Sequence, residues 1–552
     1  MGNWSWNFNP PALSAVDSTA STDSASWKTE RSPSSYTLPG SVGSTAHTRT
    51  IHVPIDVTNA LQSKGLYADQ QGIVRWRHDS IQSVHPRRWP LIRKIYDSAV
   101  ICFMEFVMTL ISNAGTSIAP EAKDHLGISN ELALFCFTTL YLLGDALGGL
   151  LFPPLAESFG GRTLYVSATI GFSAACLILG ACPNLPVIIV TRFIMGFLSA
   201  MPGVVGAGSI ENMWDTKARV WLIHIWICSA VLGLAVAPPI TTIVNESHLG
   251  WHWNFYIAAA VTAGIAVLCL GIEESRPSQL LRQQVKDIKH KTSFQRLSLD
   301  DSDTPPDFRT FVRTSLTLPI RLFFTEPIVF LTAIMGATVY GVIYLFSAAL
   351  PDVYVRQYGF STLQSSLVSL SIGVGVAFTF LPRIYDIRVA CRKSAHAIQP
   401  EDKLMGFFIA APVLAIGLWW FALTVPPLIH GVLPWASIAS LVLFGYAVVE
   451  FDNVLSGYLC DTYASHAASA ISPMSFLRAI LSGVFPLFGS QMFRNLGANY
   501  AMFILAGIAT IFCVVAVLFR MYGKRIRESS PMAEKTRNAN AEVHVHVPMA
   551  GV

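Results

Sequence analysis

The chain has 552 residues, of which 52% are hydrophobic and only 13% are charged. In soluble proteins about a quarter of all residues are charged. This composition therefore excludes an ordinary soluble domain and favours a membrane protein with many spans. The formal net charge of +4 is too small to indicate a nucleic-acid partner. The nine cysteines include no CxxC pair, so the sequence predicts neither a zinc site nor a disulfide framework.

Residues 1–85 are rich in Ser and Thr, with scattered Pro and Gly and no hydrophobic periodicity. This composition predicts a disordered cytosolic tail. No secretory signal peptide opens the chain, so we expect the first apolar helix to direct insertion into the membrane.

Apolar segments of about 20 residues follow, which is the length that crosses a bilayer. Six are predicted at 98–119, 132–152, 163–182, 186–207, 220–244 and 253–272, and six more at 327–350, 362–382, 404–424, 433–457, 467–490 and 498–521. These define an N-terminal half (98–272), a polar cytosolic linker (273–326), a C-terminal half (327–521) and a cytosolic tail (522–552). The sequence therefore predicts an all-α polytopic membrane protein with 12 transmembrane helices in two six-helix halves.

Lys and Arg residues are distributed unevenly between the two sides of this topology. The loops on one side carry only Lys123, Arg356 and Arg494, whereas the termini and the linker carry many more. The positive side is normally cytosolic, so we expect both termini to be cytosolic. The sequon at Asn245 then falls in an outside loop and is a glycosylation candidate.

The stretch from Gly144 to Arg162 reads GDALGGLLFPPLAESFGGR and ends in a short polar loop that contains Glu157, Gly160 and Arg162. It resembles the loop between the second and third helices of the fungal twelve-span drug:proton antiporters of the major facilitator superfamily. Gly161 stands where those proteins often have a second basic residue. The resemblance implies the major facilitator fold and alternating access driven by a proton gradient, with no cofactor. It also implies that this loop motif takes part in the conformational change.

The resemblance extends from about residue 89 to residue 527. In the fifth span Gly233 and Pro238 match the antiporter motif, whereas Leu234 and Ala237 replace one of its prolines and one of its glycines. Gly233 and Ala237 are small residues four positions apart, a spacing that permits close helix packing.

Two carboxylates interrupt the first and second spans, each on a polar stripe. The stripe of the first span holds Glu105, Thr109 and Ser112, and that of the second holds Thr138, Tyr141 and Asp145. A charge within a span costs about 2.5–3.5 kcal/mol on insertion scales and is a functional candidate by default. Low dielectric favours the protonated carboxyl group, as a proton carrier requires. The alternative is that both groups only hydrogen-bond or pair within the bundle.

The fourth span contains Arg192 followed by Gly196, which resembles the family's R-x-x-x-G motif. That resemblance implies a role in proton transfer. A guanidinium keeps its proton at cellular pH, so we expect Arg192 to hold a network of carboxylates or carbonyls. The alternative is that Arg192 pairs with neighbouring groups only to stabilise the fold.

The tenth span carries two acids on opposite faces, because Glu450 shares a stripe with Asn453 whereas Asp452 points away from it. We expect Glu450 to face the cavity, with Arg478 of the eleventh span or a substrate cation as its partner. Tyr340 and Tyr344 lie in the middle of the seventh span, four residues apart. They are candidates for the cavity wall, and simple packing is the alternative.

We therefore expect a proton-coupled exporter of small organic molecules such as drugs, toxins or fungal metabolites. The alternatives are a proton symporter or facilitator for a nutrient or polyamine, and a transporter-like sensor without flux. No GxxxxGK[ST] motif, catalytic constellation or metal-binding motif stands out, so neither an ATP-driven pump nor an enzyme is predicted. The expected partners are the lipid bilayer, protons and the substrate, for a monomer in the plasma membrane or, alternatively, the vacuolar membrane.

Overall fold

The computed structural model describes residues 53–69, 71–77, 84–299, 317–392, 400–426, 428–429, 431–463, 467–528 and 530. The chain divides into two compact units, residues 1–49 and residues 50–552. All the described residues belong to the second unit. The sequence predicts disorder for residues 1–85, and residues 1–52 of this segment lie outside the described ranges.

The described residues contain twelve helices long and apolar enough to cross a membrane, which confirms the predicted number of spans. In the N-terminal half these spans are built from α2 (Leu91–Leu126), α3 (Asn130–Leu134), the π-helix η2 (Phe135–Thr139), α4 (Leu140–Phe159), α5 (Gly161–Ala181), α6 (Leu185–Met213), α7 (Thr216–Asn245) and α8 (Trp253–Leu270). In the C-terminal half they are built from α12 (Pro327–Tyr358), α13 (Thr362–Leu367), α14 (Leu370–Phe378), α15 (Phe380–Arg392), α16 (Met405–Thr424), α17 (Pro434–Thr462), α18 (Ala467–Leu496) and α19 (Ala498–Glu528).

Several helices are longer than the apolar segments that predicted them. The first span was expected at 98–119, and α2 runs from Leu91 to Leu126, where Gly127 ends it in a left-handed conformation. Hydropathy detects only the apolar centre of a helix, whereas backbone hydrogen bonds continue into the polar turns on both sides. We use the two ends of α2 to name the two ends of the bundle, the Leu91 end and the Leu126 end.

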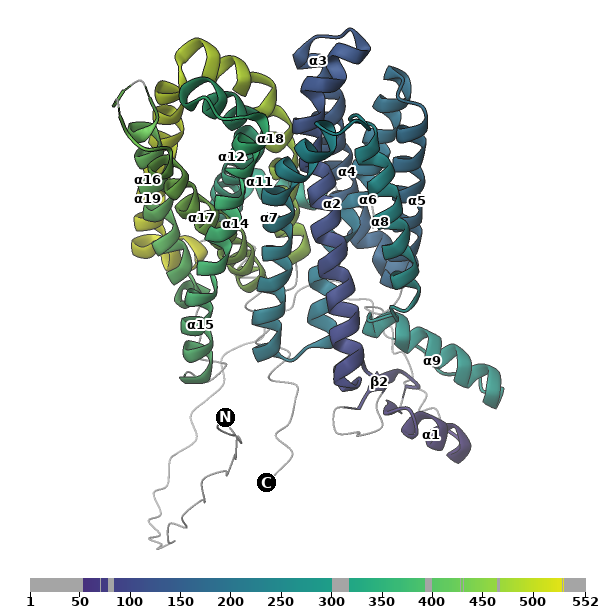
Figure 1. Cartoon of the computed structure of the whole chain (residues 1–552). Helices are drawn as coiled ribbons and strands as arrows, with labels where there is room; N and C mark the ends of the chain where they lie inside the picture. Colours follow the sequence, from purple (N-terminus) through teal and green to yellow (C-terminus); the bar gives the residue numbers. More distant parts are fainter. Residues whose placement is uncertain are drawn as a thin grey trace, which may run out of the picture. The chain divides into compact units, whose positions relative to one another are not determined.

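Each half is held together by helices that are neighbours in space (Figure 1). In the N-terminal half α2 packs on α7, α4 on α6 and α5 on α8, and in the C-terminal half α12 packs on α18 and α16 on both α17 and α19. Fewer elements join the halves, chiefly α4 with α18 and α7 with α14. The cavity described below lies along this boundary.

Glycines allow the closest of these helix contacts. A Cβ atom at Gly233 of α7 would clash with the Phe106 carbonyl oxygen and Thr109 Oγ1 of α2, and one at Gly196 of α6 would clash with the Tyr141 carbonyl oxygen of α4. Lipid supplies no hydrophobic drive between helices, so such close backbone approach carries much of the association energy.

A small folded module lies at the Leu91 end, where the N-terminal segment meets the linker. It consists of α1 (Ile55–Gln62), the antiparallel strands β1 (Leu66–Ala68) and β2 (Val74–Trp76), and α9 (Pro277–Thr292). The residues of its core are Val57, Leu61, Leu66, Val74, Leu281, Val285, Ile288 and Leu297. The expectation of disorder over residues 1–85 is therefore wrong for 53–69 and 71–77. The sequence did not reveal this core because its two parts lie about 200 residues apart and each contributes only a few apolar residues.

The linker is partly helical. It contains α9 and the short helix α11 (Leu318–Thr325), and residues 300–316 between them lie outside the described ranges. At the other end of the chain α19 continues to Glu528, beyond the expected boundary of the tail at residue 522.

The packing at Gly233 yields a stability prediction. We expect Gly233→Ala to lower thermal stability in detergent, because overpacking a helix contact costs about 1–3 kcal/mol. The matched control is Gly264→Ala on α8, where an added Cβ atom would meet no atom within 4 Å. Fluorescence-detected size-exclusion chromatography after heating measures the monodisperse fraction. Equal loss in both variants would contradict the proposed packing role.

Candidate functional site

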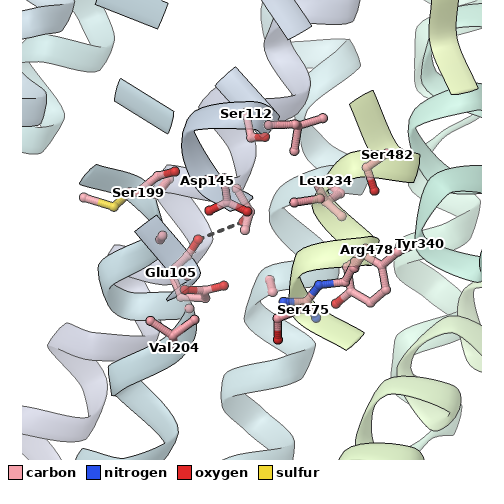
Figure 2. Close-up of a pocket in the computed structure, with 18 of the residues that line it drawn as sticks. Glu105, Ser112, Asp145, Ser199, Val204, Leu234, Tyr340, Ser475, Arg478 and Ser482 are labelled. Atoms are coloured by element: carbon pink, nitrogen blue, oxygen red, sulfur yellow. Dashed lines mark hydrogen bonds between the residues drawn. The ribbon is translucent and has the colours of Figure 1, made fainter. Parts of the chain in front are cut away.

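A cavity lies between the two halves, about halfway along α2 (Figure 2). Its volume is about 80 Å³. The polar residues of its wall are Glu105, Thr109 and Ser112 on α2, Tyr141 and Asp145 on α4, Ser199 on α6, Trp226 on α7, Tyr340 and Tyr344 on α12, Asp452 on α17, and Ser475, Arg478 and Ser482 on α18. We call this space the central cavity.

The N-terminal half contributes two carboxyl groups to the central cavity. Glu105 is 6% exposed and Asp145 is partly buried, and both line the same space. Among the described residues neither forms an ion pair with a Lys or Arg side chain. Figure 2 shows Glu105 and Asp145 on one side of the cavity, facing Arg478 and Tyr340 on the other. The stripes expected on the first two spans thus bring both acids together.

The C-terminal half contributes a cation that is already paired. Arg478 Nη1 lies 3.1 Å from Asp452 Oδ1 and 3.3 Å from Asp452 Oδ2. Tyr340 Oη donates to Asp452 Oδ2 at 3.2 Å, and the Arg478 guanidinium stacks 4.6 Å from the centre of the Tyr340 ring. One arginine therefore serves three carboxyl groups of the cavity: it pairs with Asp452 beside it and faces Glu105 and Asp145 on the opposite side.

The expectation that Glu450 faces the cavity is wrong. Glu450 is fully buried inside the C-terminal half, where its Oε2 atom accepts a hydrogen bond from Arg383 Nη2 at 2.6 Å. Arg383 Nη1 also lies 2.8 Å from Asp386 Oδ2, so the three side chains form a separate ion cluster. Residues two apart on a helix point about 200° apart, and periodicity alone did not decide which of the two acids faces inward. Asp452 is the cavity residue, and Asn453 does not line the cavity.

Arg192 lies behind the cavity wall and holds backbone carbonyls. It is fully buried, its Nε atom donates to the Phe137 carbonyl oxygen at 2.7 Å, and its Nη2 atom donates to the same oxygen. Its guanidinium lies 4.6 Å from the centre of the ring of Tyr141, a residue of the cavity wall. Phe137 belongs to the π-helical turn η2, a type of turn often found at functional sites. Thr138, in the same turn, is buried and does not line the cavity.

Two cavity-lining groups have no hydrogen-bond partner within the described part of the chain. These are Trp226 Nε1 and Ser482 Oγ. A buried polar group without a partner costs about 1–3 kcal/mol. A bound ligand or water that contacts these atoms would recover that energy.

Polar contacts join the two halves toward the Leu126 end of the cavity. Ser112 Oγ and Tyr344 Oη are 2.8 Å apart, and Asn113 Nδ2 donates to Ser347 Oγ at 2.8 Å. Thr139 Oγ1 donates to the carbonyl oxygen of Gly483 at 2.7 Å, which joins η2 to α18. The sequence analysis missed Asn113 and Thr139, although a polar side chain within an apolar span was a usable signal.

A second group of contacts joins the halves toward the Leu91 end. His224 Nε2 on α7 lies 3.0 Å from Thr379 Oγ1, and the His224 ring packs edge-on against Phe380 of α15. Trp221 stacks on the same phenylalanine ring. Contacts between the halves thus lie toward both ends of the cavity. Its volume is far below the roughly 300–1,000 Å³ of a pocket for a drug-sized ligand, so it must widen to admit one.

The loop motif lies at the Leu91 end, against the start of the linker. Gly160 has a φ of +86°, and an added Cβ atom there would meet Glu274 Oε2. The same oxygen accepts a hydrogen bond from the Arg162 backbone N–H at 3.1 Å, and Arg162 Nη2 donates to the Leu270 carbonyl oxygen at 3.2 Å. The loop therefore holds the end of α8. The side chain of Glu157 lies outside the described residues.

The remaining candidates, Pro238 and Asn245, take part in the packing of the helices. Pro238 is buried within α7, one turn beyond the packing contact at Gly233. Asn245 Nδ2 donates to the Ser117 carbonyl oxygen at 3.1 Å, and its Oδ1 accepts from Asn254 Nδ2 at 2.7 Å. Nδ2 is the atom that a glycan would occupy, and here it holds α7 to α2.

Comparisons with known proteins agree with this architecture. Residues 101–486 match the model of the Major Facilitator Superfamily. The chain is 28% identical over 454 residues to "Multidrug transporter TPO1_2" of Candida glabrata, covering 82% of this chain and 78% of that protein. It is 30% identical over 439 residues to "Efflux pump FUBT" of Fusarium oxysporum, covering 78% and 72%.

Solved structures support the same fold. The xylose transporter XylE from E. coli, in a partially occluded inward open conformation, matches with a TM-score of 0.56 and 15% sequence identity, covering 78% of this chain and 98% of that chain. The fungal relatives confirm the resemblance to the drug-efflux type of this family. The twelve spans, the two halves and the family match together show that the chain is a membrane transporter of the Major Facilitator Superfamily.

Proposed function

We propose that this transporter exports small organic molecules in exchange for protons. The observation that carries the proposal is the pair of carboxyl groups, Glu105 and Asp145, that face the central cavity without a basic partner among the described residues. The names of the fungal relatives, which include a multidrug transporter and an efflux pump, support the direction of transport.

The mechanism follows from competition between protons and the transported molecule for these carboxyl groups. When both are ionised, the cavity carries three carboxylates against one guanidinium, and it attracts a cationic or polar neutral molecule. When protons neutralise them, that attraction is lost. Because a proton and a ligand that use the same groups weaken each other's binding, their movement is coupled in opposite directions.

The polar contacts between the halves would then work as two gates. We assign the Leu91 end to the cytosol, because the basic residues lie there, and the Leu126 end to the outside. Separation at the contact between His224 and Thr379 would open the cavity to the cytosol. Separation at Ser112 and Tyr344 would open it to the outside. Protonation from the outer side would favour release of the ligand there.

The cavity wall indicates the substrate class. Tyr141, Tyr340, Tyr344 and Trp226 provide aromatic faces, which suit planar or cationic molecules. The excess of carboxylates disfavours anions. We infer that the substrates are neutral or cationic organic molecules, moved by a monomer with cytosolic termini in the plasma membrane.

Asp145 is the carboxyl group whose change tests the coupling to protons. Asp145→Asn removes one titratable group with little change in shape, so proton-driven efflux should fall at least tenfold while binding of neutral substrates remains. Accumulation of fluorescent and radiolabelled compounds in expressing cells, with and without a proton gradient, measures this. Asp352→Asn is the matched control, because Asp352 is exposed and lies near the end of α12.

Two results would contradict the proposal. Wild-type cells that accumulate more compound than cells without the protein would show that transport is inward. Efflux by Asp145→Asn that keeps the full response to the proton gradient would show that Asp145 does not couple the two movements.

The two acids of α17, Asp452 and Glu450, should respond differently to substitution. Asp452→Asn leaves Arg478 without its carboxylate in the cavity, so the KM for cationic substrates should rise about tenfold or more, whereas thermal stability should fall less than in Glu450→Ala because the Arg478 side chain is 24% exposed. Glu450→Ala instead breaks a buried ion pair, which costs on the order of 3 kcal/mol, so stability should fall with a nearly unchanged KM. Efflux kinetics and thermal unfolding of the purified variants distinguish these outcomes. The reverse pattern would contradict the assignment of Asp452 to the cavity.

A further inference from the structure

The linker helix α9 has one apolar face, and that face is already covered. Leu281, Val285 and Ile288 are buried against residues of α1 and the hairpin, including Leu61 and Val74. An amphipathic helix beside a membrane commonly inserts its apolar face between the lipids. Here the N-terminal segment occupies that face, so insertion is not available to α9.

The face that remains exposed is basic. The helical period places Lys286 and His290 opposite Leu281 and Ile288, and Lys289 lies on the flank of the same face. Lys286 and His290 are exposed, and neither lysine forms an ion pair with a described residue. The single acidic residue of α9 is Asp287, whose Oδ2 atom lies 4.0 Å from Lys64 Nζ.

The start of α9 is fixed at the Leu91 end of the bundle. Glu274 Oε1 accepts from the Arg276 backbone N–H at 3.0 Å, while its Oε2 accepts from the Arg162 backbone N–H. Glu273 forms an ion pair with Arg93 near the start of α2. Only a few residues separate the end of α8 at Leu270 from the start of α9 at Pro277. The helix therefore begins at the level where the membrane spans end.

Figure 1 shows how α9 continues from that point. It extends sideways from the Leu91 end of the bundle, with α1 on the side away from the bundle. Because the apolar face of α9 meets α1 on the side away from the bundle, its basic face is directed toward the bundle.

We propose that the basic face of α9, formed by Lys286, Lys289 and His290, binds the headgroups of anionic phospholipids in the leaflet at the Leu91 end. Each basic residue close to an anionic surface strengthens binding about fivefold. The contact is electrostatic, since α1 and the hairpin cover the apolar face. It holds the linker between the two halves at the membrane surface, and it is independent of the central cavity.

The test uses the full-length protein in neutral detergent, titrated with phosphatidylserine or phosphatidylcholine and measured by native mass spectrometry. We expect wild type to bind phosphatidylserine in preference to phosphatidylcholine. In K286E/K289E the Kd for phosphatidylserine should rise about 25-fold, as two fivefold contributions are lost. The matched control K123E/R356E reverses two charges near the Leu126 end and should leave this Kd unchanged.

A second measurement separates charge attraction from apolar insertion. Added salt screens exposed charges, so the Kd for phosphatidylserine should rise with ionic strength in wild type and hardly change in K286E/K289E. The proposal is overturned if both charge-reversal variants lose binding equally, if wild type does not prefer the anionic lipid, or if its binding does not depend on salt.

Discussion

A charge buried within a membrane-spanning bundle needs a partner, and three of the charged side chains inside this transporter show how the fold supplies one. Arg478 is paired within the cavity, Arg192 donates to a carbonyl oxygen, and Glu450 accepts from an arginine. Glu105 and Asp145 differ from these groups, because no basic side chain among the described residues neutralises them. Carboxylates that no basic side chain of the protein neutralises are free to bind a proton or a ligand instead.

The helices pack closely within each half, whereas fewer contacts join the two halves to each other. Inside the N-terminal half, Gly233 and Gly196 bring backbones so close that a single added carbon would clash. Between the halves, the contacts described at the two ends of the cavity are hydrogen bonds such as those of Ser112 with Tyr344 and of His224 with Thr379. Close packing resists deformation, whereas a few polar contacts can break and reform. This difference suits two rigid halves that move around a central site.

Much of the fold could be predicted from the sequence, because each span carries its own signal in about 20 apolar residues. Glu105 and Asp145 were also found, since a carboxylate in an apolar run is conspicuous and the helical period places it on a stripe. The choice between Glu450 and Asp452 failed because both faces of α17 are buried, so periodicity did not distinguish the cavity face from the face toward α15. The module of α1, the hairpin and α9 was missed because its core forms only when distant segments meet.

The central claim is that protons and substrate compete for the carboxyl groups of the central cavity. The most direct test measures protons released when a transported compound binds to the purified protein in weakly buffered detergent solution. The account predicts release by wild type at a pH where Glu105 and Asp145 are partly protonated, and loss of most of this release in Glu105→Gln/Asp145→Asn. Binding without any proton release by wild type, or equal release by the double variant, would contradict it.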